Sequence, residues 1–347
     1  MTSSFVIVGS RVSSAEKGLS LFSFDEATGQ LTLTGSYSGI EMPTYQVFNK
    51  KASLLYSVSE ILEKEGSVQT FKVNPSSPTP FTPTHSILTG GTSPCHLSLS
   101  PDNSFLAVSN YSDGVFTLYA LDLEGTIATV VSYKSFKGVG HNPARQEGPH
   151  IHSSNWTVDS KNLFVADLGL DRIIHYTKPE WGFPSFKKLP LGSGPRHMVL
   201  TPDGRFLYIG CELSNQVLVY QIDKYDSCFT HLQTIPTLPS LYHLENTVAD
   251  IHLSSDSRFL YCSNRGHDSI ATYAVQKETG MLSLVSITPT LGKEPRNFTL
   301  SPSGRWLLAA NGSSDSVVVF PLDTQTGVPL QAVCTVAVRQ PVCLLFS

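Results

Sequence analysis

The sequence has little charge, and what it lacks argues against several classes of protein. Only 15% of its 347 residues are charged, and the formal net charge is −4. Lysine and arginine form no run, so the charge pattern predicts no nucleic-acid partner. No apolar run reaches the roughly 18 residues of a membrane span, and the first residues, MTSSFVIVGS, do not have the pattern of a secretory leader. We therefore expect a cytoplasmic protein without a membrane partner.

The cysteines also lack the spacing of a metal or redox site. No Cys-x-x-Cys pair occurs, and the six cysteines lie mostly within apolar segments: Cys95, Cys211, Cys228, Cys262, Cys334 and Cys343. A G-x-S-x-G nucleophile elbow is absent as well. These absences favour free, buried thiols in a reducing compartment. They predict no cofactor, no bound metal and no covalent nucleophile.

An internal repeat is the main feature that the sequence does have. An apolar segment that opens with Pro or Ala runs into a polar turn and a second apolar segment, as in PRHMVLTPDGRFLYIGC from Pro195. Other copies start at Pro94, Pro149, Ala249 and Pro295, a degenerate copy starts at Pro43, and a truncated one, PVCLLFS, starts at Pro341. The starts recur about every 50 residues, and a third and a fourth apolar segment follow each complete pair. Four short strands in a repeat of this length are typical of a β-propeller blade.

The two ends of the chain complement each other. The last segment, PVCLLFS, supplies only a first strand, whereas residues 1–36 contain segments that fit the second, third and fourth strands. We therefore predict one domain over residues 1–347. Its fold class is all-β, a seven-bladed β-propeller with four antiparallel strands per blade, closed by pairing of the N- and C-terminal strands in one blade. An open row of sheets with frayed ends is the alternative. Few helices are expected, because no long segment has helical periodicity.

The repeat also predicts where functional side chains gather. Because the first and second strands of a blade are antiparallel, the start of the first strand lies beside the end of the second. Polar residues of mixed charge occupy these positions: His96, His150, His152, Arg196, His197, His252 and Arg296 at the starts, with Glu212 and Arg265 at the ends. The loop before His152 adds Arg145 and Glu147. Such a set has no packing reason to converge, so we predict a pocket for an anionic, oxygen-rich small molecule at this rim.

Structural roles remain open for individual members of this set. They could be strand-end ion pairs, solvated carboxylates or histidines that pack along the channel wall. His150 and His152 are two apart in a strand and point to the same side, as a pair of zinc ligands would. A zinc site needs a third ligand, however, and only Glu147 or another blade offers one. The acidic residues are interleaved with arginine, which argues against calcium.

Several motifs resemble the seven-bladed lactonase family, which includes the bacterial propeller-type 6-phosphogluconolactonases and the fungal carboxy-muconate lactonizing enzyme. They are ARQEGPHIH (144–152), FVADLGLDRI (164–173), GPRHMVLTPDG (194–204), ELSN (212–215), ADIHLSSDSRFLYCSNR (249–265) and EPRNFTLSPSG (294–304). The resemblance covers essentially the whole chain. It implies hydrolysis of a sugar lactone, most simply 6-phosphogluconolactone to 6-phosphogluconate in the pentose phosphate pathway. It also implies that the family's active-site residues are His150, Arg196, Glu212 and Arg265 here.

For this chemistry we expect attack by water. Either Glu212 or His150 would take a proton from the water molecule, and Arg196 and Arg265 would hold the oxyanion or an anionic group of the substrate. The other candidates would bind the sugar hydroxyls and the phosphate: His96, Arg145, Glu147, His152, His197, His252 and Arg296.

Two other functions fit the sequence. The same side chains could close a muconate-type diacid by adding a proton, and turnover of carboxy-muconate without turnover of the sugar lactone would identify that activity. A non-catalytic interaction platform would instead tolerate Arg196→Ala and would present an apolar or single-sign patch on a blade. The chain lacks the Gly-His and Trp-Asp signature of interaction repeats, which argues against a platform. We expect a monomer or a weak homo-oligomer.

Overall fold

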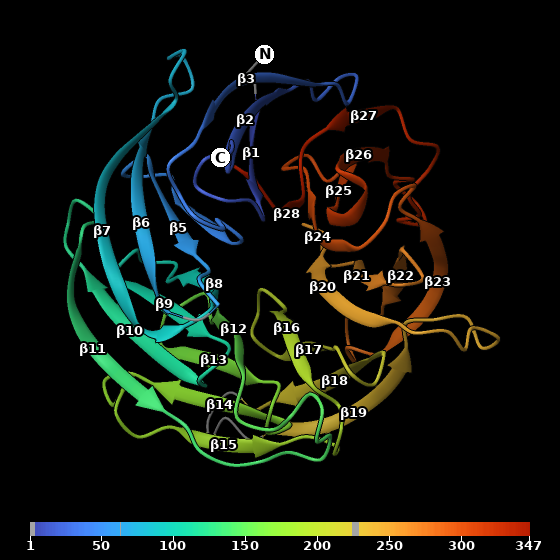
Figure 1. The fold of residues 1–347 in the computed structure, drawn as a ribbon. Coiled ribbons are helices and arrows are strands. Elements are labelled where there is room, and N and C mark those ends of the chain that lie inside the picture. Colours follow the sequence, from blue (N-terminus) through green and yellow to red (C-terminus); the bar gives the residue numbers. More distant parts are fainter. Residues whose placement is uncertain (1–3, 63, 224–228) are drawn as a thin grey trace. The chain divides into compact units, whose positions relative to one another are not determined.

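Strands dominate the computed structural model, which describes residues 4–62, 64–223 and 229–347 (Figure 1). The strands form seven four-stranded sheets, as the repeat predicts. Within the described ranges the only helix is the single 3-10 turn η1 (Gly312–Ser314), so none is long and apolar enough to cross a membrane. Cys228 lies outside the described residues, and the cysteines inside them form no disulfide with one another.

The chain divides into two compact units. The middle unit comprises Ser13–Gly18 and Ser36–His197, and the terminal unit comprises Met1–Val12, Leu19–Gly35 and Met198–Ser347. Two of the boundaries, Gly35/Ser36 and His197/Met198, fall inside strands, and the other two lie between Ser10 and Leu19. This division does not test whether residues 1–347 form a single domain, which stays a prediction.

Three sheets belong to the middle unit, each with its strands in sequence order. The first contains β4 (Gln46–Asn49), β5 (Leu54–Ser59), β6 (Glu65–Val73) and β7 (Phe81–Thr92). The second contains β8 (Pro94–Leu99), β9 (Phe105–Asn110), β10 (Val115–Leu121) and β11 (Ile127–Ser135). The third contains β12 (Ile151–Trp156), β13 (Asn162–Asp167), β14 (Arg172–Thr177) and β15 (Ser185–Lys188).

Four sheets lie wholly or largely in the terminal unit. Three keep the sequence order: β16 (Pro195–Leu200), β17 (Phe206–Cys211), β18 (Gln216–Ile222) and β19 (Phe229–Pro236); β20 (Thr247–Leu253), β21 (Phe259–Arg265), β22 (Ser269–Val275) and β23 (Leu282–Pro289); β24 (Pro295–Leu300), β25 (Trp306–Asn311), β26 (Ser316–Pro321) and β27 (Cys334–Ala337). The fourth has the order β28-β1-β2-β3, with β28 (Pro341–Phe346), β1 (Ser4–Ser10), β2 (Leu19–Phe24) and β3 (Leu31–Tyr37).

The fourth sheet joins the two ends of the chain. β28 pairs antiparallel with β1, with Val6 opposite Phe346 and Val8 opposite Leu344. These side chains enter a buried cluster with Phe24 and other apolar residues of β2, β25 and β26. Burial of this cluster stabilises the C-terminal strand β28 against β1. β28 thereby provides the first strand of the sheet, which the N-terminal segment does not contain. The predicted pairing of the terminal strands in one sheet is confirmed.

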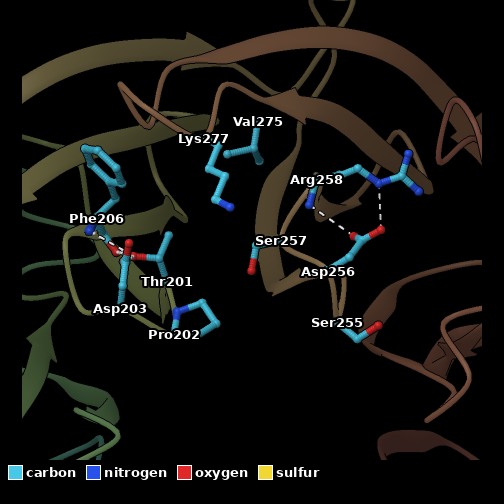
Figure 2. Close-up of a pocket in the computed structure, with 10 residues that line it drawn as sticks. All are labelled: Thr201, Pro202, Asp203, Phe206, Ser255, Asp256, Ser257, Arg258, Val275 and Lys277. Atoms are coloured by element: carbon cyan, nitrogen blue, oxygen red, sulfur yellow. Dashed lines mark hydrogen bonds and ion pairs between the residues drawn. The ribbon is translucent and has the colours of Figure 1, made fainter.

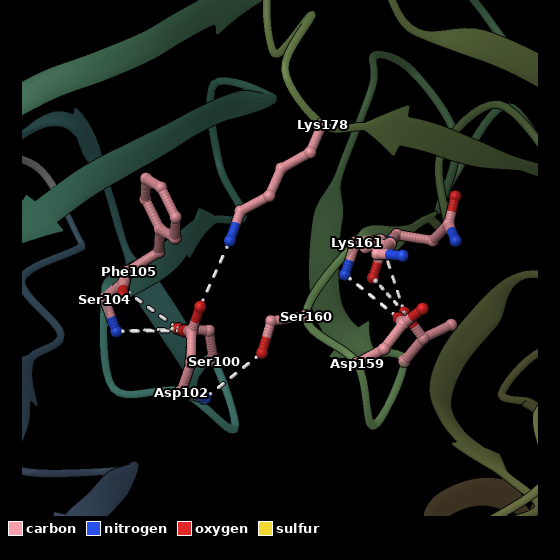
Figure 3. Close-up of polar contacts among 10 residues, drawn as sticks. Ser100, Asp102, Ser104, Phe105, Asp159, Ser160, Lys161 and Lys178 are labelled. Atoms are coloured by element: carbon pink, nitrogen blue, oxygen red, sulfur yellow. Dashed lines mark hydrogen bonds and ion pairs between the residues drawn. The ribbon is translucent and has the colours of Figure 1, made fainter.

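In several sheets, the turn between the first and second strands is built by one hydroxyl residue and one aspartate. The Thr201 hydroxyl donates to Asp203 Oδ1 at 2.6 Å and accepts the Phe206 amide at 3.0 Å. Gly204 adopts a φ of +72° that closes the turn, a conformation that side chains disfavour. Figure 3 shows the middle unit's version, in which Ser100 and Asp102 bind one another and the following amides. The motif therefore encodes the turn locally.

A glycine in the hairpin of one sheet packs against an aromatic ring of the preceding sheet. Gly327 has a φ of +71°, and a Cβ atom there would lie 2.5 Å from the Phe259 ring. The Tyr261 hydroxyl donates to the Gly327 carbonyl at 2.9 Å. The same packing recurs in the terminal unit for Gly280 with Phe206 and for Gly29 with Trp306. The glycines of the KETG, TQTG and EATG turns thus link neighbouring sheets.

The register gives every sheet two different ends. Pro94 pairs with Asn110, Ile151 with Asp167, and Pro295 with Asn311, so each first strand starts beside the end of the second. We call this the start end. The opposite end, where the hydroxyl–aspartate turns lie, is the turn end. The register confirms the antiparallel geometry from which the site residues were predicted.

Candidate active site

The start ends contain buried ionisable side chains in both units. Six of the predicted site residues are buried: His96, His150, His152, Arg196, His197 and Glu212. Arg145, His252, Arg265 and Arg296 are half-buried, and Glu147 is exposed. Buried charges are costly unless other groups satisfy them. The contacts of these side chains therefore show what each can do.

In the middle unit, the backbone amide and carbonyl of His150 are both hydrogen-bonded. The His150 amide donates to Asp167 Oδ1 at 3.0 Å, and its carbonyl accepts the Leu168 amide at 2.9 Å. Asp167 also pairs with Arg172 at 2.9 Å. Burial raises the pKa of Asp167, although the Arg172 guanidinium opposes the rise. Asp167 is thus an anchor for the backbone that leads into β12.

The ring of His150 lies between a tyrosine and a glutamate. It stacks on Tyr111, with 4.3 Å between ring centroids and 9° between planes, and its Nδ1 lies 2.9 Å from the Tyr111 carbonyl oxygen. Its Nε2 lies 3.3 Å from Glu147 Oε1. The pKa of Glu147 is lowered, first by a hydrogen bond from its own backbone and further by His150 and Arg145. The structure thus brings the predicted residues His150 and Glu147 together.

A second group in the middle unit consists of Arg196 and several aromatic rings in tilted or edge-to-face contact. His96 lies 4.2 Å from Tyr45 and 5.2 Å from His197, and His197 lies 5.4 Å from His152, between ring centroids. The Arg196 guanidinium donates to His197 Nε2 at 3.2 Å.

This contact makes His197 Nε2 an acceptor, so the neutral ring carries its proton on Nδ1. Arg196 is only 2% exposed, and its carbonyl accepts the Ser153 hydroxyl at 2.6 Å. The start end of the middle unit thus holds a buried guanidinium in contact with an imidazole ring.

In the terminal unit, Glu212 and Arg265 form a buried ion pair. Glu212 follows β17 and Arg265 ends β21, and Arg265 Nη2 lies 3.1 Å from Glu212 Oε2. The same guanidinium donates to the Val248 carbonyl at 3.2 Å. Two residues predicted from separate repeats therefore meet within one unit. The prediction that they share a pocket with His150 and Arg196 spans both units and stays a prediction.

His252 belongs to a polar network that links three sheets of the terminal unit. Its Nε2 lies 2.9 Å from Asp250 Oδ2, and the same carboxylate accepts the Asn297 side-chain amide. Asn297 Oδ1 in turn accepts the Leu344 amide at 2.6 Å. Burial lowers the pKa of His252, but the Asp250 carboxylate outweighs it and raises that pKa above its ordinary value. The sequence signal was present, because Asp250 and His252 are two apart in a strand.

Of the remaining predicted binding residues, Arg145 and Glu147 lie on the loop before β12, and Arg296 lies in β24. Arg145 and Glu147 flank Gln146, which is buried and donates to the Leu168 carbonyl at 2.8 Å. Sequence reasoning missed Gln146, which no repeat position marks. Arg296 follows Pro295 at the start of β24, and its amide donates to the Glu294 carbonyl at 2.7 Å. Within the described ranges, no group of three or more His, Cys, Asp or Glu residues is arranged to hold a metal ion.

The terminal unit has a cavity at each end of its sheets. The start-end cavity has about 320 Å³ and is lined by polar residues that the sequence analysis did not single out, chiefly Arg11, Glu294, Ser313 and Asp315. The turn-end cavity has about 330 Å³ (Figure 2). Its aspartates already bind arginines, as Asp256 does with Arg258 at 2.6 Å. The turn-end cavity therefore lacks available carboxylates, and none of the predicted site residues lines it.

Comparisons with known proteins agree with this architecture. The model of the family described as lactonase, 7-bladed beta-propeller, matches residues 5–346. A 6-phosphogluconolactonase of Bacillus subtilis is 30% identical over 100% of this chain and 99% of its own length, and one of Formosa agariphila is 33% identical over 89% and 90%. The solved structure of a periplasmic gluconolactonase of Pseudomonas aeruginosa has a TM-score of 0.92 and 31% identity over 99% of both chains. The predicted seven-bladed fold class is confirmed.

Proposed function

The chain belongs to the seven-bladed β-propeller lactonase family, and we propose that within this family it hydrolyses 6-phosphogluconolactone to 6-phosphogluconate. As a member of the family it is a lactone hydrolase. The single observation that carries the choice of substrate is the buried guanidinium of Arg196, because such a group suits a phosphate or an oxyanion. The names of the Bacillus and Formosa relatives support the same substrate.

The proposed reaction is attack of water on a cyclic ester. The water oxygen adds to the carbonyl carbon, the ring C–O bond breaks, and the proton lost by water is delivered to the leaving alkoxide. His150 is the better candidate for the base, since Glu212 is held by the Arg265 guanidinium, which stabilises the carboxylate and weakens it as a proton acceptor. A positioned base typically contributes about 10²–10⁴-fold to the rate.

The arginines are proposed to stabilise negative charge. Arg196 in the middle unit and Arg265 in the terminal unit would each bind either the oxyanion or the phosphate. The histidines around Arg196 suit sugar hydroxyls, because a neutral imidazole both donates and accepts. Arg145, His252 and Arg296 are proposed as further binding residues.

An unphosphorylated aldonolactone is the second candidate substrate. The specific observation in its favour is the gluconolactonase of Pseudomonas aeruginosa, whose structure matches along the full chain. Since that protein is named as periplasmic, the cytoplasmic location expected from the sequence stays a prediction. Cyclisation of a muconate-type diacid also stays a sequence-based alternative.

A substrate panel tests the proposal. Purified protein is assayed with 6-phosphogluconolactone, glucono-1,5-lactone and carboxy-muconate, each against its spontaneous rate. We expect the phosphorylated lactone to have the highest kcat/KM, and Arg196→Ala to lower it at least about tenfold while the protein stays folded. Preference for glucono-1,5-lactone would establish the second candidate. Turnover of carboxy-muconate alone, or of none of the three, would contradict lactone hydrolysis at this site.

A further inference from the structure

We propose that Tyr111 is a positioning residue that fixes His150 so that Nε2 is the nitrogen that accepts the proton. The inference rests on the proposed hydrolysis, in which His150 is the base. It adds a residue from a neighbouring sheet that is not among the predicted site residues. Tyr111 follows the end of β9, whereas His150 precedes the start of β12.

The hydrogen bond from His150 to Tyr111 determines the tautomer. A backbone carbonyl can only accept, so the 2.9 Å contact between the Tyr111 oxygen and His150 Nδ1 requires a proton on Nδ1. In the neutral ring, Nε2 then carries the lone pair. Fixing one nitrogen as a donor in this way assigns the role of base to the other nitrogen.

The tyrosine ring sets the plane of the imidazole. The two rings are nearly parallel, and the edge of His152 packs against the same tyrosine at 5.4 Å and 79°. The Tyr111 amide donates to the Ser93 carbonyl at 2.9 Å, so the backbone that holds the tyrosine is itself anchored. With the His150 backbone held by Asp167, rotation of the imidazole would break the stack and the hydrogen bond together.

Glu147 faces the nitrogen that remains. Its Oε1 lies 3.3 Å from Nε2, which is suited to an ion pair once Nε2 has taken a proton from water. The Glu147 side chain is 65% exposed, so it can move aside and let water reach Nε2. Tyr111 and Glu147 thus act on opposite sides of one ring, Tyr111 by orienting it and Glu147 by stabilising its protonated form.

Two Tyr111 variants separate the ring from the hydroxyl, and both keep the backbone carbonyl. Tyr111→Phe retains the stacked ring, and we expect kcat within about twofold of the wild type. Tyr111→Leu removes the ring, and we expect kcat to fall at least about tenfold, with a shifted pH–rate profile and a nearly unchanged KM. Thermal unfolding of both variants shows whether they fold.

A spectroscopic readout tests the tautomer without any activity. Imidazole ¹³C and ¹⁵N shifts are recorded, and the signals of His150 are identified by their loss in His150→Gln. We expect the Nδ1–H form in the wild type and in Tyr111→Phe, and a mixture of tautomers in Tyr111→Leu. An Nε2–H wild-type ring, a Tyr111→Leu protein with wild-type kcat and pH profile, or equal losses in both variants would overturn the proposal. Absence of lactonase activity in the wild type would refute the proposed function, while the tautomer measurement would still decide the positioning.

Discussion

The two ends of the sheets use the same kind of ion pair in opposite surroundings. At the turn end, Arg258 and Asp256 lie 2.6 Å apart with side chains 56% and 46% exposed. At the start end, Arg265 and Glu212 lie 3.1 Å apart with side chains 12% and 6% exposed. An exposed pair contributes about 0–1 kcal/mol, whereas a buried one carries a desolvation cost of several kcal/mol per ion. Asp167 at the start end anchors the backbone, but no such structural role accounts for the buried pair of Glu212 and Arg265, which is why we propose function there.

The two ends of the sheets also differ in how regularly residues recur at equivalent positions of the repeat. At the turn end of three sheets in the terminal unit, a Ser or Thr, then an Asp or Ser, and then an Arg recur at equivalent positions, and these residues form the same turn in each of the three. At the start end, the equivalent positions hold Arg196, Asp250 and Arg296 with different partners in each sheet. The uniform positions build the fold, and we propose that the positions that vary from sheet to sheet build the site.

Among the variants that test the difference between the two ends, we expect Glu212→Gln to have the largest effect on stability and activity. Removing one charge of a buried pair leaves Arg265 without its counter-ion, so we expect the free energy of unfolding to fall by about 3–5 kcal/mol. We also expect kcat/KM for the lactone to fall at least about tenfold. Urea unfolding and initial rates measure the two effects.

Asp256→Asn is the matched control, because it makes the same chemical change at the turn end. It should alter stability by less than about 1 kcal/mol and leave kcat/KM unchanged. Equal losses in the two variants would break the comparison.

A pH titration examines a buried histidine near the turn end. Burial lowers the pKa of His175 from 6.5 to about 4, and its Nε2 lies 2.9 Å from Asn162 Oδ1. The unfolded chain therefore takes up a proton near pH 6.5 that the folded ring refuses until about pH 4. Stability from this group is present above pH 6.5, and about 3 kcal/mol of it should be lost between pH 6.5 and pH 4.

Unfolding measured across that range in His175→Phe should lack this part of the acid dependence. His85→Gln, which changes an exposed histidine of β7, should keep it. Identical profiles for the wild type and His175→Phe would show that His175 is not the group responsible.

A smaller effect is expected from Gly327→Ala. The substitution combines a φ of +71° with a Cβ atom 2.5 Å from Phe259, and we expect a loss of about 2–3 kcal/mol without a change in kcat. Gly204→Ala isolates the backbone contribution, since Gly204 has a φ of +72° but no atom within 4 Å of the added Cβ. It should cost about 1–2 kcal/mol. If both variants lose the same stability, the packing of Gly327 on Phe259 contributes nothing.

The smallest effect is expected from Arg258→Met at the turn end. The substitution removes the exposed ion pair with Asp256 and the hydrogen bond to the Thr324 carbonyl, but it keeps an unbranched side chain beside Phe259. We expect a change in unfolding free energy below about 1.5 kcal/mol and an unaltered lactonase rate. A loss as large as that of Glu212→Gln would mean that the turn end also depends on its charges.

The sequence predicted the elements that depend on local pattern. The period of the repeat predicted the four-stranded sheets, and the truncated copy at Pro341 predicted the pairing of β28 with β1. The antiparallel register then placed Glu212 and Arg265 at the start end, where they form their ion pair.

Contacts between sheets were not predictable in the same way, because the repeat does not specify which side chains of neighbouring sheets meet. Three features depend on contacts that the repeat does not specify. They are the stacking of Tyr111 on His150, the hydrogen bonds from Asp250 through Asn297 to β28, and the burial of Gln146. The TQTG sequence around Gly327 is typical of a turn, but it does not indicate that Gly327 packs on Phe259 of the preceding sheet.

The most direct test of the account is the ratio of kcat/KM for 6-phosphogluconolactone between two arginine variants. Arg196→Ala removes a buried start-end guanidinium, and Arg258→Ala removes an exposed turn-end one. We expect Arg258→Ala to match the wild type and Arg196→Ala to be at least about tenfold slower, with both proteins folded. Equal rates in the two variants would contradict the assignment of catalysis to the start end.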